Sequence, residues 1–425
     1  MDLGCEGISR DGVRRILRSS ESIPANCFAA FLFRESDMKY RLLDVLRCPC
    51  GAILALSKVQ STSVKSGNPF PAAGCREMCG FRGRPISAER PATSDCTECY
   101  ATEITGGILT CDRGHEWPIE NGIPRFLPKT LAVDLKKAQD TFSFEWKMFR
   151  FGERNWGQDI SVRRGLFLKG MNVGPEELKG KTIFDAGCGS GLLSMEMAKT
   201  FGMEVFALDL AFGIENAYNH SDSPFVHFVQ GSVLEPPFRP GAFDYLYCAG
   251  VLVACPDTHD GFLSIIKTLK RGGRCFIWLY HPIDREHHPK DLRKMLFYNW
   301  IRKNVTSRLP IRVQYVLYLS LMPAFLMKQK IKMLLGTEKS PRTWREKMQS
   351  LFDMFSPLYQ NRHGESEALR WYSEEGFTNA AISYQELYGF GARGDYSTPS
   401  RPRETALSLR EERFGSVTAP STPSS

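Results

Sequence analysis

The sequence lacks an uncharged apolar run of the roughly 20 residues that a membrane-spanning helix needs. Its longest candidate, Val313 to Met327, contains Pro323. A secretory signal pattern is also missing, because Asp2 comes early and the short apolar run from Cys27 to Phe33 is followed by Arg34. A composition with 42% hydrophobic and 24% charged residues excludes collagen-like, coiled-coil and wholly disordered chains. We therefore expect a globular, cytoplasmic protein whose 425 residues form two or three domains.

Positive charge is concentrated in one segment. The whole chain carries a net charge of +8, but residues 290–347 hold 14 Lys and Arg against three acids. This segment therefore has a charge of +11, and the remainder of the chain sums to −3. Such a distribution favours a basic face on one module over a general nucleic-acid-binding protein, so we do not expect a nucleic acid partner.

Four regions differ in pattern. Residues 1–37 show no clear period and predict a weakly ordered extension, whereas residues 38–128 are rich in Cys, Gly and Pro. Residues 397–425 are rich in Ser, Thr, Pro and Arg, which predicts a disordered tail. Within residues 129–396, short apolar strands alternate with helical stretches, and this spacing predicts an α/β fold with a parallel, doubly wound sheet. The expected strands are 182–184, 205–208, 226–229, 245–248, 274–279, 380–384 and 387–394, and the expected helices include 192–199, 261–269 and 365–375.

A glycine loop after the first of these strands is the strongest chemical pattern. Asp185 is followed by Gly187, Gly189 and Gly191 at alternate positions, and a helix is expected directly afterwards. Glycine permits a tight turn and a close approach of the backbone to a ligand. A nicotinamide-type loop would need a small residue at its sixth position, which is a leucine here. Asp209 ends the second strand, where a carboxylate can accept both hydroxyls of a ribose, so the sequence predicts a nucleoside ligand.

This segment resembles the class I S-adenosylmethionine-dependent methyltransferases, in particular the UbiE-like, type 11 group that acts on small molecules. The resemblance implies a Rossmann-like, seven-stranded sheet and S-adenosyl-L-methionine as the cofactor. It also implies that Asp185 meets the methionine amino group, that Asp209 holds the ribose and that residues 230–233 contact the adenine, although Ser232 stands where the family usually has an acid. The cofactor-binding residues expected on this basis are Asp185, Gly187, Cys188, Gly189, Gly191, Asp209, Leu210, Ser232, Val233 and Cys248.

Candidate catalytic bases are few. Many relatives place a histidine just after the fourth strand, but residues 252–254 are Leu, Val and Ala. No Asn-Pro-Pro-Tyr motif stands there either, which disfavours methylation of amide or base amino nitrogens. The remaining candidates are Tyr280 and His281 at the carboxyl end of the fifth strand, and His363, with a structural hydrogen-bonding role as the alternative for each. We expect in-line displacement, in which alignment and exclusion of water dominate.

Seven cysteines lie between residues 48 and 111, and their close spacing in a chain without a secretory signal favours metal binding over disulfides. The ligands expected for two structural Zn²⁺ ions are Cys48, Cys50, Cys75, Cys79, Cys96, Cys99, Cys111 and His115. Spacing slightly favours pairing in chain order, the first four with one ion and the last four with the other. Residues 42–49 and 117–126 resemble the two ends of the Trm112-like zinc ribbon, which implies instead that Cys48 and Cys50 pair with Cys111 and His115. Free thiols are the other alternative, and under either pairing we expect chelation to unfold this module while leaving the following domain largely intact.

Residues 283–364 are expected to form a helical insertion beside the mouth of the site. A lid over the substrate pocket is the simpler interpretation. A second interpretation is that residues 290–347 contact the anionic inner face of a membrane to reach a lipid-linked substrate, because basic residues flank apolar ones there.

The sequence therefore predicts a zinc-ribbon domain fused to a methyltransferase that acts on a small organic or lipid-linked metabolite. One alternative is a non-catalytic, cofactor-binding scaffold whose zinc module engages a partner protein, as Trm112-like domains do. An RNA methyltransferase is a third hypothesis, which the localised charge disfavours.

Overall fold

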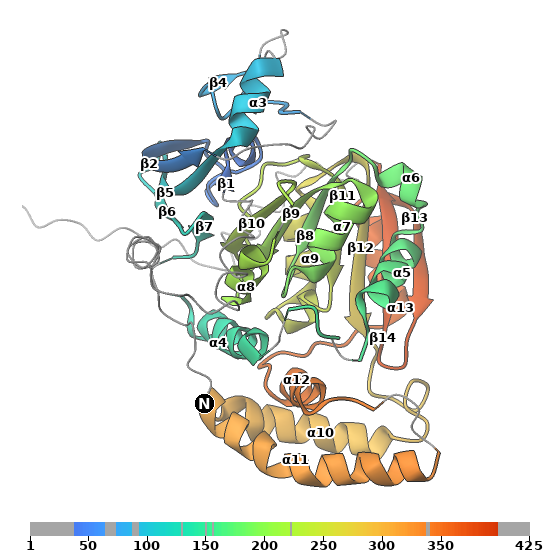
Figure 1. Cartoon of the computed structure of the whole chain (residues 1–425). Coiled ribbons are helices and arrows are strands. Elements are labelled where there is room, and N and C mark those ends of the chain that lie inside the picture. The colour runs from blue at the N-terminus through green and yellow to red at the C-terminus, as the bar shows by residue number, and fades with distance from the viewer. Residues whose placement is uncertain are drawn as a thin grey trace, which may run out of the picture.

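A computed structural model of the chain describes residues 38–63, 74–86, 93–128, 131–148, 151–154, 157–221, 223–336 and 341–397. The expected extension 1–37 and all but the first residue of the expected tail 397–425 lie outside these ranges. A central sheet carries helices on both faces, with the Cys-rich module at one end of the molecule and a layer of helices at the other (Figure 1).

The centre of the sheet follows the strand order β10-β9-β8-β11-β12-β14-β13. Strands β8 to β12 pair in parallel, whereas β14 pairs antiparallel with β12 and with β13. The bounds are β8 Thr182–Ala186, β9 Glu204–Asp209, β10 Val226–Gly231, β11 Phe243–Ala249, β12 Leu269–Tyr280, β13 Phe377–Gln385 and β14 Gly389–Tyr396. This topology confirms the predicted α/β fold. The helix predicted to reach residue 269 ends at residue 266, because Leu269 already pairs with Phe243 as the first residue of β12.

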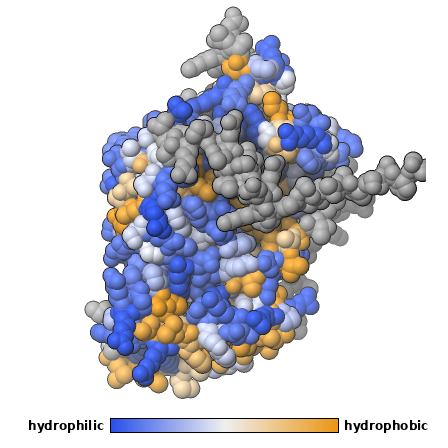
Figure 2. Space-filling view, turned by 180° about the vertical axis from the view of Figure 1, so that it is seen from behind, coloured by the Kyte–Doolittle hydropathy of each residue, from blue (hydrophilic) through white to orange (hydrophobic). Residues whose placement is uncertain are grey.

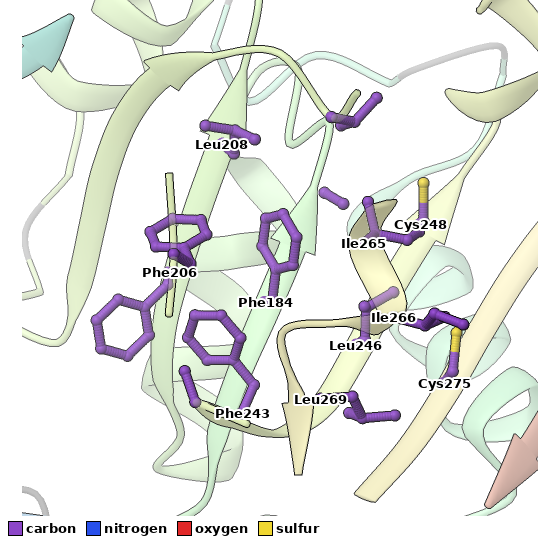
Figure 3. Close-up of a cluster of buried hydrophobic side chains, with 14 of the residues drawn as sticks. Phe184, Phe206, Leu208, Phe243, Leu246, Cys248, Ile265, Ile266, Leu269 and Cys275 are labelled. Atoms are coloured by element: carbon purple, nitrogen blue, oxygen red, sulfur yellow. The ribbon is translucent and has the colours of Figure 1, made fainter. Parts of the chain in front are cut away.

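Alternating side chains of the strands build two cores, one on each face of the sheet. Ile183 of β8 packs on one face, with helices α5 (Ile160–Met171), α7 (Leu192–Phe201) and α8 (Gly213–Asn219). Phe184 packs on the other, with α9 (Thr258–Ile266) and α13 (Glu365–Glu374). Figure 3 shows this second core, in which the rings of Phe184 and Phe206 lie 5.5 Å and 5.1 Å from that of Phe243. Helices on both faces leave the carboxyl ends of the strands open for a site.

The Cys-rich module is joined to this sheet. It contains β1 (Met38–Lys39), the 3₁₀-helix η1 (Tyr40–Asp44), β2 (Leu54–Ser63), β3 (Met78–Cys79), β4 (Arg84–Pro85), α3 (Thr93–Ala101), β5 (Thr102–Cys111), β6 (Glu116–Glu120) and β7 (Ile123–Phe126). β7 pairs in parallel with β10, so that Arg125 lies opposite Gln230 and Phe126 opposite Gly231. The sheet thus runs from the module into the core without interruption, and apolar residues of both form one buried cluster.

The segment between β12 and α13 is helical, as expected for the insertion. It contains α10 (Leu292–Asn304), the 3₁₀-helix η3 (Thr306–Arg308), α11 (Ile311–Leu334) and α12 (Trp344–Phe355). These helices form the layer at the bottom of Figure 1, and α4 (Val133–Met148) packs against α11 and α12 through Phe144. Among the described helices, none combines the length and the apolar character needed to cross a bilayer.

Candidate active site

The glycine loop has the backbone conformation that its sequence predicts. Gly187, Gly189 and Gly191 have φ values of +83°, +57° and +68°, a region that side chains disfavour. A Cβ atom on Gly189 would lie 2.4 Å from Cζ2 of Trp146, so this glycine is also required for packing. The backbone N–H of Gly189 donates to Oδ2 of Asp209 at 2.8 Å, which fixes that carboxylate beside the loop.

A cavity of about 610 Å³ opens at the carboxyl ends of the strands, beneath α4 and α12. Seven of the predicted cofactor-binding residues line it: Gly187, Cys188, Gly189, Asp209, Leu210, Ser232 and Val233. The structure thus brings the glycine loop, the end of β9 and the end of β10 to one wall of the cavity.

Asp185, Gly191 and Cys248 lie behind this wall instead of lining it. The Asp185 carboxylate accepts a hydrogen bond from Oγ of Ser194 at 2.5 Å. Burial raises the pKa of Asp185 to about 6, although Ser194 and the charge of Arg163 oppose the rise. Direct contact of Asp185 with a ligand therefore stays a prediction.

Tyr280 lines the cavity, but His281 and His363 do not. His281 follows the last residue of β12, and its ring packs on the rings of His287 and Phe390, outside the set of residues that line the cavity. His363 packs its ring on Trp371 at a centroid distance of 4.9 Å, and its Nδ1 lies 3.2 Å from Oε2 of Glu367. The expectation that either histidine serves as the base at this cavity is therefore wrong in geometry.

Two carboxyl groups in the cavity, of which Glu145 is buried and Asp353 is half-buried, were not predicted from the sequence. Glu145 of α4 and Asp353 of α12 both line it, and Oη of Tyr280 donates to Oδ2 of Asp353 at 3.3 Å. Burial raises the pKa of Asp353 to about 6. Burial also raises the pKa of Glu145 well above its ordinary value, and the charge of Asp353 adds to this rise. The sequence held one signal for Glu145, because this acid stands among the aromatic residues Phe142 and Trp146 of α4, where an apolar side chain is expected.

Arg163 of α5 is a third residue of the cavity that was not predicted from the sequence. It lines the cavity, and within the described chain its buried Nη1 atom has no hydrogen-bond partner. Burial lowers the pKa of Arg163, whereas Tyr247 and Asp185 act in the opposite direction. An unsatisfied, buried guanidinium nitrogen facing a cavity suits an anionic ligand group.

A group of possible metal ligands lies in the Cys-rich module. Ligand atoms of Cys48, Cys50, Cys111 and His115 all lie within 4.8 Å of one another. The antiparallel pairing of β2 with β5 brings them together, because Leu54 lies opposite Cys111. This is the arrangement that the zinc-ribbon resemblance implies, and the pairing in chain order is wrong because Cys96 and Cys99 lie on α3, outside this group.

The other four cysteines of the module are Cys75, Cys79, Cys96 and Cys99, and the first three are near enough to act on the thiol of the fourth, although they do not form a group as compact as the first one. Burial raises the pKa of Cys99 to about 12, and the other three thiols add to the rise. They come from the segment around β3 and from α3, which both contact η1. Thiols gathered from separate segments in this way have the composition of a second tetrahedral site.

Fold and site together define an α/β protein of the Rossmann type, with the glycine loop and Asp209 at the wall of its cavity. Residues 184–277 match the family model described as a methyltransferase domain, so the chain contains a methyltransferase domain. Phosphoethanolamine N-methyltransferase 2 of Caenorhabditis elegans is 30% identical over 106 residues, which cover 24% of this chain and 24% of that protein. A ubiquinone biosynthesis O-methyltransferase of Xanthomonas euvesicatoria is 33% identical over 105 residues, which cover 24% of this chain and 44% of that protein.

The chain thus spans less than half of the length of these curated relatives. Among solved structures, a complex of the Haloferax volcanii Trm112 methyltransferase activator with a methyltransferase superposes with a TM-score of 0.39 at 14% identity. That match covers 62% of this chain and 99% of the other.

Proposed function

We propose that this protein transfers a methyl group from S-adenosyl-L-methionine to a small organic or lipid-linked metabolite. The observation that carries the proposal is Asp209, fixed by the glycine loop at the wall of a cavity that also holds two carboxyl groups. The cofactor, when bound, supplies an electrophilic methyl group on its sulfonium.

The residues of the cavity fit this cofactor. Asp209 suits the ribose hydroxyls, and its carboxylate already accepts N–H groups from Gly189 and Ala211 at 2.8 Å each. The unpartnered Nη1 of Arg163 suits the carboxylate of the methionine moiety, and Ser232 and Val233 line the region proposed for the adenine. A Cβ atom on Gly187 would lie 2.2 Å from Cγ2 of Val251, so packing against Val251 requires glycine at this position of the loop.

Asp353 is the proposed general base. If the substrate offers a hydroxyl group, or an ammonium group that must first lose a proton to become a nucleophilic amine, the Asp353 carboxylate would accept that proton. Tyr280 orients that carboxylate through its hydrogen bond to Oδ2. Burial raises the pKa of Glu145 well above its ordinary value, which favours the protonated form of this neighbour of Asp353. Residues of α4 and α12 cover this part of the cavity and exclude water.

A lipid-linked substrate is favoured by the outer surface of the insertion. α10 and α11 expose large apolar side chains to solvent, and basic residues such as Arg312, Lys328 and Lys330 stand among them. The exposed apolar residues are Leu296, Phe297, Trp300, Val313, Val316, Leu317, Leu319, Leu321, Phe325, Met327, Ile331, Met333 and Leu334. Figure 2 shows apolar surface interspersed with hydrophilic surface at this end of the molecule. An apolar face with interspersed cations suits the interface of an anionic membrane.

We further propose that the Cys-rich module holds two structural Zn²⁺ ions, one at Cys48, Cys50, Cys111 and His115 and one at Cys75, Cys79, Cys96 and Cys99. Closed sites of four ligands stabilise folds and do not catalyse. Because β7 pairs with β10 of the same chain, the module's first partner is its own methyltransferase sheet. This supports an internal role over that of a scaffold for another protein.

Methyl-labelled cofactor incubated separately with lipid and aqueous extract fractions tests the activity. We expect label to enter the lipid fraction, and to be lost with Asp353→Asn while the cofactor still binds. Label in the aqueous fraction alone would contradict the lipid-linked substrate. Cofactor binding without label in any fraction would favour the scaffold.

Flotation with anionic vesicles at low salt tests the membrane surface. We expect binding to anionic but not to neutral vesicles, and weaker binding after Val316→Glu, a change on an exposed position. Equal flotation of Val316→Glu and the natural protein, or none of either, would contradict this surface.

A further inference from the structure

Three potential metal ligands meet outside the cavity, at the two ends of the insertion. His281 directly follows β12, His287 lies in the loop before α10, and Glu365 is the first residue of α13. Their ligand atoms all lie within 4.8 Å of one another. Neither the methyltransferase chemistry nor the cysteine sites use these residues.

His281 has the property expected of a ligand whose partner is missing. His281 is only 4% exposed, yet within the described ranges its Nδ1 atom has no hydrogen-bond partner. Buried polar atoms are nearly always satisfied, so an orphan at a cluster of ligands calls for an explanation. A metal ion between His281 and its neighbours would provide one.

The other two side chains are held by neighbouring groups. Nδ1 of His287 lies 2.8 Å from Oδ1 of Asp284, which leaves the Nε2 lone pair available to a metal. Oε1 of Glu365 accepts a hydrogen bond from Nε2 of Gln385 at 2.6 Å, which holds this carboxylate in place. A carboxylate behind a histidine, and a donor behind a carboxylate, are the usual supports of metal ligands.

We propose that His281, His287 and Glu365 bind a divalent transition-metal ion such as Zn²⁺. Two imidazoles and one carboxylate match the borderline preference of this ion, and a fourth position would be left for water. The alternative is a purely structural stack, since the two imidazole rings lie 4.4 Å apart at an angle of 27°. That alternative does not explain why the buried Nδ1 of His281 has no hydrogen-bond partner among the described residues.

The position of the site suggests what the ion does. His281 and His287 precede the three helices of the insertion, and Glu365 follows them, so one ion would tie the two ends of the insertion together. Hydrogen bonds already join the same ends, because the N–H of His363 donates to the carbonyl of Tyr280 at 2.9 Å. Since α12 carries Asp353 into the cavity, the ion would limit the movement of that carboxyl group relative to Tyr280.

Titration of the metal-free full chain with Co²⁺ tests the site. Cobalt at the cysteines gives thiolate charge-transfer bands in the near ultraviolet, whereas cobalt at an imidazole and carboxylate site gives only weak visible bands. We expect the natural protein to take up one equivalent more than His287→Ala or Glu365→Gln, with unchanged thiolate bands. His220→Ala, which removes an exposed histidine elsewhere, should bind as the natural protein does.

Equal cobalt uptake by the natural protein and by Glu365→Gln would overturn the proposal. This variant keeps the shape of the side chain, so it is informative even where His287→Ala fails to fold. Because the readout is metal bound per chain, the result does not depend on whether methyl transfer has been observed.

Discussion

Nη2 of Arg41 lies 3.0 Å from Oε2 of Glu204, and neither side chain is more than 4% exposed. The pair joins η1 of the Cys-rich module to the first residue of β9. Oε1 of Glu204 also accepts from Oη of Tyr100 and lies 3.1 Å from Nε2 of His227. Charges from the two halves of the chain therefore neutralise one another inside the protein.

Glu204→Gln should destabilise the whole protein, because it leaves the guanidinium of Arg41 buried with less compensating charge. Breaking one partner of a buried pair costs about 3–5 kcal/mol of unfolding free energy. Denaturant unfolding would measure the loss. Asp140→Asn, in the exposed pair with Lys136, is the control, with an expected change of less than about 1 kcal/mol. Similar losses of unfolding free energy in both variants would contradict a special role for the pair of Arg41 and Glu204.

The same pair predicts how stability depends on pH. Burial opposes ionisation of Glu204, but Arg41 and His227 outweigh it, so its pKa lies below the ordinary value. A carboxyl whose pKa is depressed by folding stabilises the fold above its unfolded pKa, and this stabilisation is lost on acidification. Unfolding free energy should therefore fall more steeply in acid for the natural protein than for Glu204→Gln. If the unfolding free energies of the two proteins fell in parallel as the pH is lowered, this prediction would be contradicted.

Asp209→Asn should weaken cofactor binding, because it removes the charge from the carboxylate proposed to accept the ribose hydroxyls. A hydrogen bond to a charged group contributes about 1.5–3 kcal/mol, which corresponds to roughly ten- to a hundredfold in Kd. Titration calorimetry with S-adenosyl-L-methionine would measure it. Asp257→Asn is the matched control, since Asp257 caps α9 and asparagine caps helices equally well. Unchanged binding by Asp209→Asn would contradict the assignment.

The rate of methyl transfer should rise as the pH passes about 6 and then level off, because Asp353 must lose its proton to act as a base. Tyr280→Phe should move this rise to higher pH, since the hydrogen bond from Tyr280 lowers the pKa of Asp353 and its loss would raise it. Profiles of kcat/KM against pH for the two proteins would decide. A rise at the same pH in both would exclude Tyr280 as a positioning residue.

Chelation should lower the unfolding temperature of the whole protein in one transition. The sequence alone predicts that only the Cys-rich module would unfold, but the structure favours a joint transition, because β7 pairs with β10 and the two halves share one buried cluster. Differential scanning calorimetry with and without a chelator is the measurement. Two separate transitions, of which only one responds to the chelator, would restore the earlier expectation.

Local patterns allowed much of the fold to be predicted. The glycine loop needs only neighbouring residues to specify a strand, a turn and a helix, and Asp209 stands at a fixed place at the end of the next strand. Glu145 and Asp353 could not be paired in this way, since they meet through the packing of α4 against α12. The cysteine pairing failed for the same reason, because the β2–β5 register decides which ligands meet.

The pairing of β7 with β10 limits how this chain can be divided. A fragment that begins after residue 128 would expose the edge of β10 and a strip of apolar core, and bare strand edges of this kind promote aggregation. The smallest part of the protein that can be expressed or exchanged as a unit therefore begins at or before Met38. Gene fusions that transplant the methyltransferase half alone should yield insoluble protein, and recombination between relatives should keep the two halves together.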